Sequence, residues 1–108
     1  MYEGRYTQRF FDQLEEKTFR QQKDKIRDKC EMILQDPFHA CKSEPLRYEY
    51  KGKRGGRLDN RYRIIYTICE ECYKQGHLEA NRLDCPNCAD VPMKTVTFLD
   101  ITDHYRIM

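Results

Sequence analysis

The chain has 108 residues, of which 35% are charged, and its formal net charge is +2. This length gives one domain with a single modest core, and the balanced charge excludes a polycation that binds nucleic acid along its whole length. No apolar run approaches the ~20 residues of a membrane span, and the opening segment MYEGRYTQRFF lacks the apolar part of a signal peptide. We therefore expect a cytoplasmic protein, in which clustered cysteines bind metal more often than they form disulfides.

The N-terminal half has helical periodicity. Residues 6–11, YTQRFF, are expected to be a first strand that runs into a short helix. Thr18 and Gln21 have the spacing of a capping box and predict that a second helix opens there. Asp36 precedes a proline and ends this helix, because proline disfavours the α conformation of the residue before it. The predicted buried stripe of the helix consists of Phe19, Ile26, Cys30, Ile33 and Leu34.

The second half changes to a period of two, which is typical of strands. Residues 46–50 alternate and predict a strand, whereas the glycines that follow loosen the chain. Asp59 and Asn60 predict a tight turn. Residues 62–68 then alternate as a strand, and this alternation places Arg61, just before the strand, and Arg63 on the same face.

The last predicted strand is the run KTVTFLDI, residues 94–101. Its alternation places Val96 and Phe98 on one face, opposite Thr97, Leu99 and Ile101. Residues 1–108 are therefore expected to form a single α+β domain, with N-terminal helices packed on a small antiparallel sheet.

Four cysteines stand between the last two predicted strands. They form two CxxC pairs separated by twelve residues, namely Cys69, Cys72, Cys85 and Cys88. Four thiolates complete a tetrahedral zinc site with no open position for substrate, so the predicted Zn²⁺ is structural, one ion per chain. Disulfides and an iron–sulfur cluster are the alternatives. Residues 69–88 are thus predicted to be a zinc-binding insertion, in which the metal orders an unusually long connection between two strands of a hairpin.

A basic segment precedes the cysteines. Residues 51–63 hold six Lys or Arg residues against one Asp. Such a segment suits phosphate or an acidic partner, although a solvated hairpin rim accounts for it equally well. The predicted RNA-binding residues are Lys51, Lys53, Arg54, Arg57 and Arg61.

Three further residues suit cleavage of RNA through its own 2′-hydroxyl group. That reaction needs a base, an acid and a cation that stabilises charge on the phosphate, and it needs no metal. Arg63 is the candidate cation, His104 the candidate acid or base, and Tyr105 a proton donor or stacking group. The predicted sheet brings them together, because the strand that leads to His104 neighbours the strand of Arg63.

The segments ILQDPF, PLRYEYKGKRGGRLDNRYRIIYTI and VTFLDITDH resemble the RelE/ParE superfamily of toxins from toxin–antitoxin systems. The resemblance covers residues 2–68 and 93–105 and does not extend to the cysteine insertion. It implies a small α+β fold and neutralisation by a cognate antitoxin. In the RelE branch it implies metal-independent cleavage of messenger RNA on the ribosome, and in the ParE branch inhibition of DNA gyrase. Arg63 corresponds to the family's strand arginine, Arg54 and Arg57 to its preceding basic residues, and His104 and Tyr105 to its C-terminal pair.

Three hypotheses follow from the residues and the resemblance. The first is an endoribonuclease toxin with messenger RNA, the ribosome and an antitoxin as partners. The second is a ParE-type gyrase inhibitor without enzymatic activity. The C-terminal His-Tyr pair favours the first hypothesis over the second. The third is a zinc-stapled module that binds nucleic acid or protein through the cysteine loop. The net acidic composition of residues 69–90 disfavours direct RNA binding by that loop.

Overall fold

A computed structural model describes residues 1–77, 81 and 92–104 of the chain. Its strands are β1 (Glu3–Tyr6), β2 (Glu44–Pro45), β3 (Arg54–Arg57), β4 (Tyr62–Ile68) and β5 (Thr95–Asp103). Its α-helices are α1 (Gln8–Leu14), α2 (Lys23–Gln35) and α3 (Cys69–Gln75), and its 3₁₀ helices are η1 (Arg20–Gln22), η2 (Ala40–Lys42) and η3 (Tyr48–Tyr50). None of the described helices is long and apolar enough to cross a membrane.

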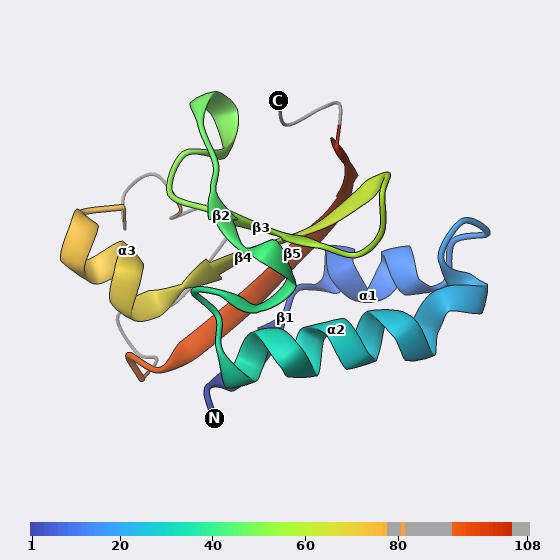
Figure 1. The fold of residues 1–108 in the computed structure, drawn as a ribbon, viewed down its shortest axis with the longest axis horizontal. Helices are drawn as coiled ribbons and strands as arrows, with labels where there is room; N and C mark the ends of the chain where they lie inside the picture. Colours follow the sequence, from blue (N-terminus) through green and yellow to red (C-terminus); the bar gives the residue numbers. More distant parts are fainter. Residues whose placement is uncertain (78–80, 82–91, 105–108) are drawn as a thin grey trace.

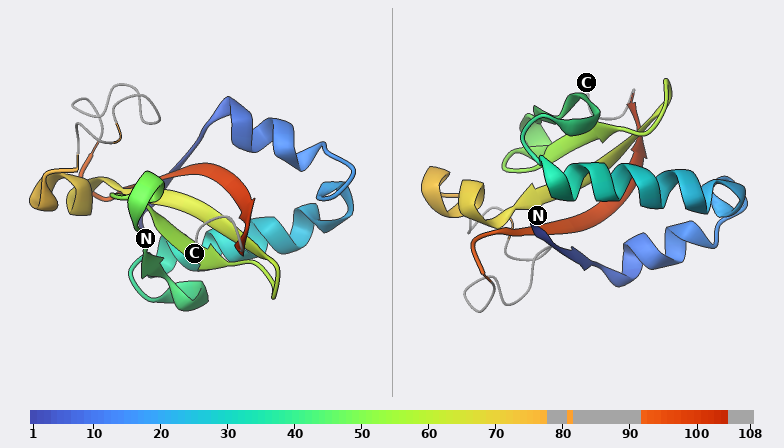
Figure 2. Two further views of the ribbon diagram at one scale, coloured as in Figure 1. Left: turned by 90° about the horizontal axis from the view of Figure 1, so that it is seen from above. Right: turned by 60° about the horizontal axis from the view of Figure 1, so that its bottom comes forward.

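The strands form one five-stranded sheet in the order β1-β5-β4-β3-β2. Neighbouring strands from β5 to β2 are antiparallel, as predicted, and β1 adds a parallel edge beside β5. Helices α1 and α2 pack on one face of the sheet (Figure 1; Figure 2, right). The predicted α+β class is thus confirmed, with the central pair β4 and β5 formed by the two most strongly alternating segments.

The main core lies between the helices and the sheet. The predicted stripe of the second helix is confirmed, since Ile26, Cys30, Ile33 and Leu34 are all buried there. The predicted start of the helix at Thr18 is wrong, because the side chain of Thr18 does not cap it. Instead Gln22 Nε2 donates to the Thr18 carbonyl, and a 3₁₀ turn precedes α2.

The predicted strand over residues 46–50 is also wrong. The chain leaves the sheet after β2 and forms η3, in which Tyr48 has a φ of +57° and is 83% exposed. A straight strand would place Leu46, Tyr48 and Tyr50 on one face. The turn instead projects Tyr48 outward and lets Leu46 and Tyr50 pack with Ile65 and Leu99 in a second, smaller core.

The glycine-rich segment forms a strand, β3, that alternation of side chains could not reveal. Gly56 lies beneath α2, and a Cβ atom there would stand 3.0 Å from Ile33 Cδ1. A contact of this length is tighter than nine in ten real Cβ contacts, so any side chain here would force Ile33 to shift, and the close approach of helix to sheet favours glycine.

Strand β5 contains a bulge that changes which face its side chains occupy. Ile65 pairs with Asp100 and Tyr66 pairs with Phe98, so Leu99 is the extra residue. The predicted placement of Ile101 opposite Phe98 is therefore wrong, since Ile101 returns to the helix-side core. Leu99 and Asp100 both face the other side of the sheet, where they line a common pocket.

The side chain of Gln13 in α1 completes the hydrogen bonding of β5 beyond the end of β1. Its Nε2 donates to the Ile101 carbonyl at 3.0 Å, and its Oε1 accepts from the Ile101 N–H at 2.9 Å. Gln13 Nε2 also donates to Asp100 Oδ1 at 2.6 Å. A buried amide thus takes the place of a neighbouring strand and fixes the orientation of the Asp100 carboxylate.

Candidate nucleic-acid interface

The face of the sheet away from α1 and α2, called here the second face, presents two arginines from adjacent strands. Arg57 of β3 is the cross-strand partner of Arg63 in β4. Directly opposed residues project from the same face with their Cβ atoms about 5 Å apart. Arg57 is exposed, whereas Arg63 is 5% exposed and its Nη1 donates to the carbonyl oxygens of Asp59 at 2.9 Å and Tyr62 at 3.1 Å.

The two guanidinium groups raise the positive potential at this point of the second face. Burial lowers the pKa of Arg63 from its ordinary value, and the charge of Arg57 lowers it further, which outweighs the opposite effects of Glu44 and Asp59. Within the described part of the chain, neither arginine forms an ion pair with a carboxylate. Two like charges held side by side favour the binding of an anion between them.

The predicted RNA-binding residues of the basic segment divide between the two faces. Lys53 is nearly buried and lines a pocket of the second face, the same face as Arg57, and Lys51 is exposed. Arg54 stands between Lys53 and Arg57 in the sequence and projects to the helix side. Its Nε donates to Glu71 Oε2 at 2.9 Å and its Nη1 to Ser43 Oγ at 3.1 Å. We therefore leave Arg54 out of the interface, because its guanidinium is engaged in the fold.

Arg61 and His104 lie at the end of the sheet where β4 begins and β5 ends. Arg61 lies just before β4, its guanidinium is largely exposed, and its Nε donates to Asp103 Oδ2 at 3.0 Å. The His104 N–H donates to the Arg61 carbonyl at 2.6 Å. Thr102 is the cross-strand partner of Arg63, so His104 follows two residues beyond that partner. Tyr105 lies outside the described residues.

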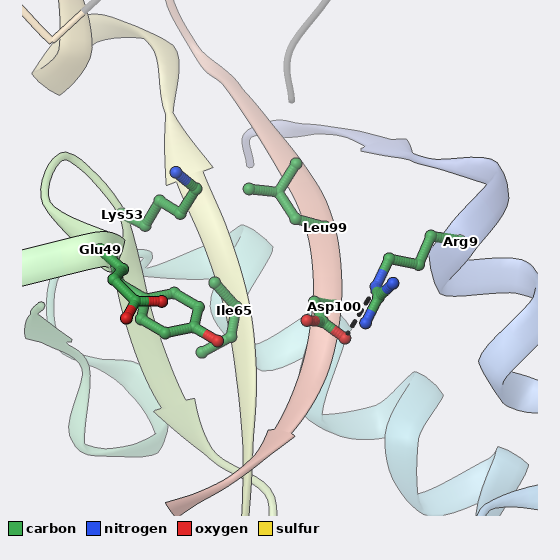
Figure 3. Close-up of a pocket in the computed structure, with 7 residues that line it drawn as sticks. Arg9, Glu49, Lys53, Ile65, Leu99 and Asp100 are labelled. Carbon is green, nitrogen blue, oxygen red and sulfur yellow. Dashed lines mark ion pairs between the residues drawn. The ribbon is translucent and has the colours of Figure 1, made fainter. Parts of the chain in front are cut away.

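A pocket with a volume of about 310 Å³ lies on the second face and is lined by Ile65, which follows Arg63 by two residues in β4 (Figure 3). Ile65, Leu99 and Tyr50 supply its apolar lining. Its charged lining consists of two cations, Arg9 of α1 and Lys53 just before β3, and two carboxylates, Glu49 of η3 and Asp100 of β5. Arg9 Nε lies 3.3 Å from Asp100 Oδ1, an ion pair drawn as a dashed line in Figure 3.

Sequence reasoning did not select Arg9, Glu49 or Asp100 as site residues. Arg9 reads as an ordinary surface residue of a short helix, and Glu49 lies in a segment that was expected to be a strand. Asp100 offered one signal, since it is the only charged residue in the run TVTFLDIT and an acid in a central strand needs partners. Two of its partners, Arg9 and Gln13, come from α1, about ninety residues earlier in the chain.

The first cysteine pair lies on α3. Cys69 and Cys72 occupy the first turn of the helix at a spacing that places both on one side of it. Cys72 is 4% exposed, and Asn81 Nδ2 donates to its Sγ at 3.3 Å. The Cys72 thiol in turn donates to the Gly52 carbonyl at 3.8 Å. The deprotonated thiolate is the form of cysteine that binds zinc. Cys85 and Cys88 lie outside the described residues, within which no three metal-ligating side chains gather.

Helix α3 is held against the sheet by its acidic residues. Glu71 pairs with Arg54, whose guanidinium also lies 5.1 Å above the ring of Phe38. The neighbouring Glu70 accepts a hydrogen bond from the Tyr2 hydroxyl, which raises the pKa of Tyr2 to about 12. The start of the cysteine segment is therefore anchored at two points by side chains of the sheet and its connections.

The fold and the arginine pair define a small α+β protein with a basic sheet surface. No family model matches the chain, and no curated protein matches it significantly. Two solved structures are similar, a YoeB–YefM complex from Staphylococcus aureus and a heterotetrameric YoeB–YefM toxin–antitoxin complex from the same organism. Each has a TM-score of 0.57 and 16% sequence identity, over 97% of this chain and 99% of the matched chain. This likeness shows the fold.

Proposed function

We propose that this protein is a RelE-type toxin that cleaves messenger RNA on the ribosome and is neutralised by a cognate antitoxin. The observation that supports it most is the pair of opposed arginines, Arg57 and Arg63, on the second face of the sheet. The fold is that of chains from YoeB–YefM toxin–antitoxin complexes, and the sequence resembles the RelE/ParE superfamily. Fold and charge thus support the same class of protein from independent observations.

The proposed reaction transfers the scissile phosphate to the neighbouring 2′-oxygen. A base takes the 2′-hydroxyl proton, the 2′-oxygen bonds to phosphorus, and the bond from phosphorus to the 5′-oxygen breaks as that oxygen takes a proton. Arg63 stabilises the charge that develops on the phosphate oxygens, with Arg57 beside it. His104 acts as acid or base at the end of β5, and Tyr105 follows it as proton donor or stacking group. No metal takes part in these steps.

Induced expression of the protein tests this function directly. We expect translation to stop and new 5′ ends to appear within messages at ribosome-bound codons, and we expect coexpression of the cognate antitoxin to prevent both effects. Mapping message ends while measuring plasmid supercoiling separates the alternatives. Intact messages with altered supercoiling would instead support a gyrase inhibitor of the ParE type. Intact messages with normal supercoiling and normal growth would contradict both toxin functions.

We further propose that Cys69, Cys72, Cys85 and Cys88 bind one structural Zn²⁺. The helical spacing of Cys69 and Cys72 fits a pair of ligands to one ion. The ion would staple the segment between α3 and β5 and would take no part in catalysis.

Substitution of Cys85 by Ser is expected to release about one zinc ion per chain and to lower the melting temperature. Removing one of four thiolates opens the tetrahedron, and the metal's contribution to folding is lost with it. Metal content by mass spectrometry and thermal unfolding are the measurements. Cys30→Ser is the control for zinc content, because Cys30 lies in the helix-side core. Full zinc content in the Cys85→Ser protein would contradict the four-thiolate site.

A further inference from the structure

We infer that the pocket between η3, β4, β5 and α1 is a subsite for one nucleobase of a bound nucleic acid, with preference for bases that carry an exocyclic amino group. The inference rests on the proposed function, because it supposes that RNA lies across the second face. It adds a second contact to the phosphate site at Arg57 and Arg63. The residues that carry it are Tyr50, Ile65 and Leu99 with the charged groups around them.

The lining of the pocket matches the surface of a nucleobase. A base has flat apolar faces and a polar edge with both donors and acceptors. The pocket supplies an apolar floor from Ile65 and Leu99, an aromatic ring from Tyr50, and charged groups of both signs at its rim. A phosphate would meet two carboxylates as well as two cations, and a purely apolar ligand would take water away from the charged rim and offer it no hydrogen bond in return. The combination of an apolar floor and a charged rim therefore favours an aromatic ligand with a polar edge.

The carboxylates of the pocket are placed to accept hydrogen bonds. Asp100 Oδ1 already accepts from Gln13 and lies close to Arg9, and its Oδ2 accepts from Thr102 Oγ1 at 2.9 Å. A carboxylate offers about four acceptor positions, so one remains on Oδ2. Glu49 is exposed at the pocket edge and adds a second acceptor. Acidic side chains accept from the amino group of cytosine, and uracil has no such group.

The pocket has the right position for a nucleotide whose phosphate lies at the arginine pair. Ile65 follows Arg63 by two residues in β4, so both side chains project from the second face. Two residues of a strand span about 6.6 Å. One nucleic-acid chain can therefore place a phosphate at Arg57 and Arg63 and a base over Ile65. Stacking on the Tyr50 ring would add affinity that does not depend on base identity.

The chain contains no tryptophan, which allows a single fluorescent reporter to be placed in the pocket. Tyr50→Trp places the reporter in the lining, and Tyr48→Trp is the matched control, because Tyr48 lies in the same 3₁₀ helix, points to solvent and does not line the pocket. Each variant is titrated with the 5′-monophosphates of adenosine, cytidine and uridine and with ribose 5-phosphate. Circular dichroism and thermal unfolding show whether each variant is folded.

We expect saturable quenching of the Tyr50→Trp reporter by the adenosine and cytidine nucleotides, at least about tenfold weaker binding of the uridine nucleotide, and little response in the control. One hydrogen bond to a charged acceptor accounts for a factor of this size. Adding Glu49→Gln should narrow the difference between cytidine and uridine, since an amide can also donate. Equal responses to ribose 5-phosphate and to nucleotides, or equal responses of the two reporters, would overturn the inference.

The proposed function and the nucleobase subsite can fail separately. Message cleavage measured in cells reports on the function, and the fluorescence titration reports on the pocket of the purified protein. Cleavage together with a silent Tyr50→Trp reporter in a folded protein would refute the subsite and leave the function standing. Base-dependent quenching without message cleavage would refute the endoribonuclease function and leave the subsite standing.

Discussion

Substitution of Arg63 by alanine is expected to reduce message cleavage about 10²- to 10³-fold, the usual cost of removing one group that stabilises charge in a transition state. Arg63 has two properties that support this size of effect. It is nearly buried, so its charge is poorly screened, and the Asp59 and Tyr62 carbonyls hold its guanidinium in one orientation. The measurement is the rate of message cleavage after induced expression, with cell growth as a second readout.

Two further variants separate a role at the phosphate from a role in folding. Arg63→Lys retains the charge and loses the planar fork, so its activity should lie between those of the wild type and Arg63→Ala. Arg27→Ala removes an exposed arginine of α2, on the opposite side of the sheet, and should retain full activity. Thermal unfolding shows whether each protein is folded. A folded Arg63→Ala protein with wild-type cleavage would contradict the proposed site.

Substitution of Glu71 by alanine is expected to lower the free energy of unfolding by about 3–5 kcal/mol, the usual cost of breaking a buried ion pair. The side chains of Arg54 and Glu71 are only 13% and 8% exposed. Removing the carboxylate leaves the guanidinium buried with only Ser43 Oγ and the Phe38 ring among the partners described above. Urea unfolding of the purified protein measures the change.

The Arg54→Met/Glu71→Leu double variant tests whether this loss comes from an unpaired charge. Replacing both members of a buried pair by apolar side chains is often close to neutral, so the double variant should regain most of the stability. Asp24→Ala breaks an exposed ion pair of α2 with Arg27 and serves as the matched control, with an expected change below about 0.5 kcal/mol. A Glu71→Ala protein as stable as this control would show that the pair does not hold α3 against the sheet.

The structure gives different surroundings to two arginines that the sequence treats alike. Arg54 and Arg57 are both strongly basic residues of one glycine-rich segment, and both were predicted to bind RNA. A strand sends residues three apart to opposite faces. Arg57 consequently shares the second face with Arg63, and Arg54 reaches Glu71 on the helix side. The two faces can be assigned only when this segment is known to be a strand, and the glycines at positions 55 and 56 remove the side-chain alternation that would have predicted it.

The sequence by itself determined the features that depend on neighbours along the chain. The stripe of α2 follows from helical spacing, and the end of that helix follows from the proline after Asp36. Strand β4 follows from its alternation, and the turn before it follows from Asp59, whose Oδ1 accepts from the N–H groups of Arg61 and Tyr62 at 2.8 Å each. Local propensity and periodicity suffice for such features, because the residues that decide them are a few positions apart.

Only the tertiary structure decided which side chains meet on the second face. The bulge at Leu99 turns Asp100 toward the pocket, and α1 supplies Gln13 and Arg9 to hold it there. The approach of α2 explains Gly56, and the turn at η3 places Tyr50 beside Ile65 and Leu99. Each of these contacts joins elements that are distant in the sequence. No periodicity within one segment can reveal them, because their energy depends on packing between segments that are brought together only when the chain folds.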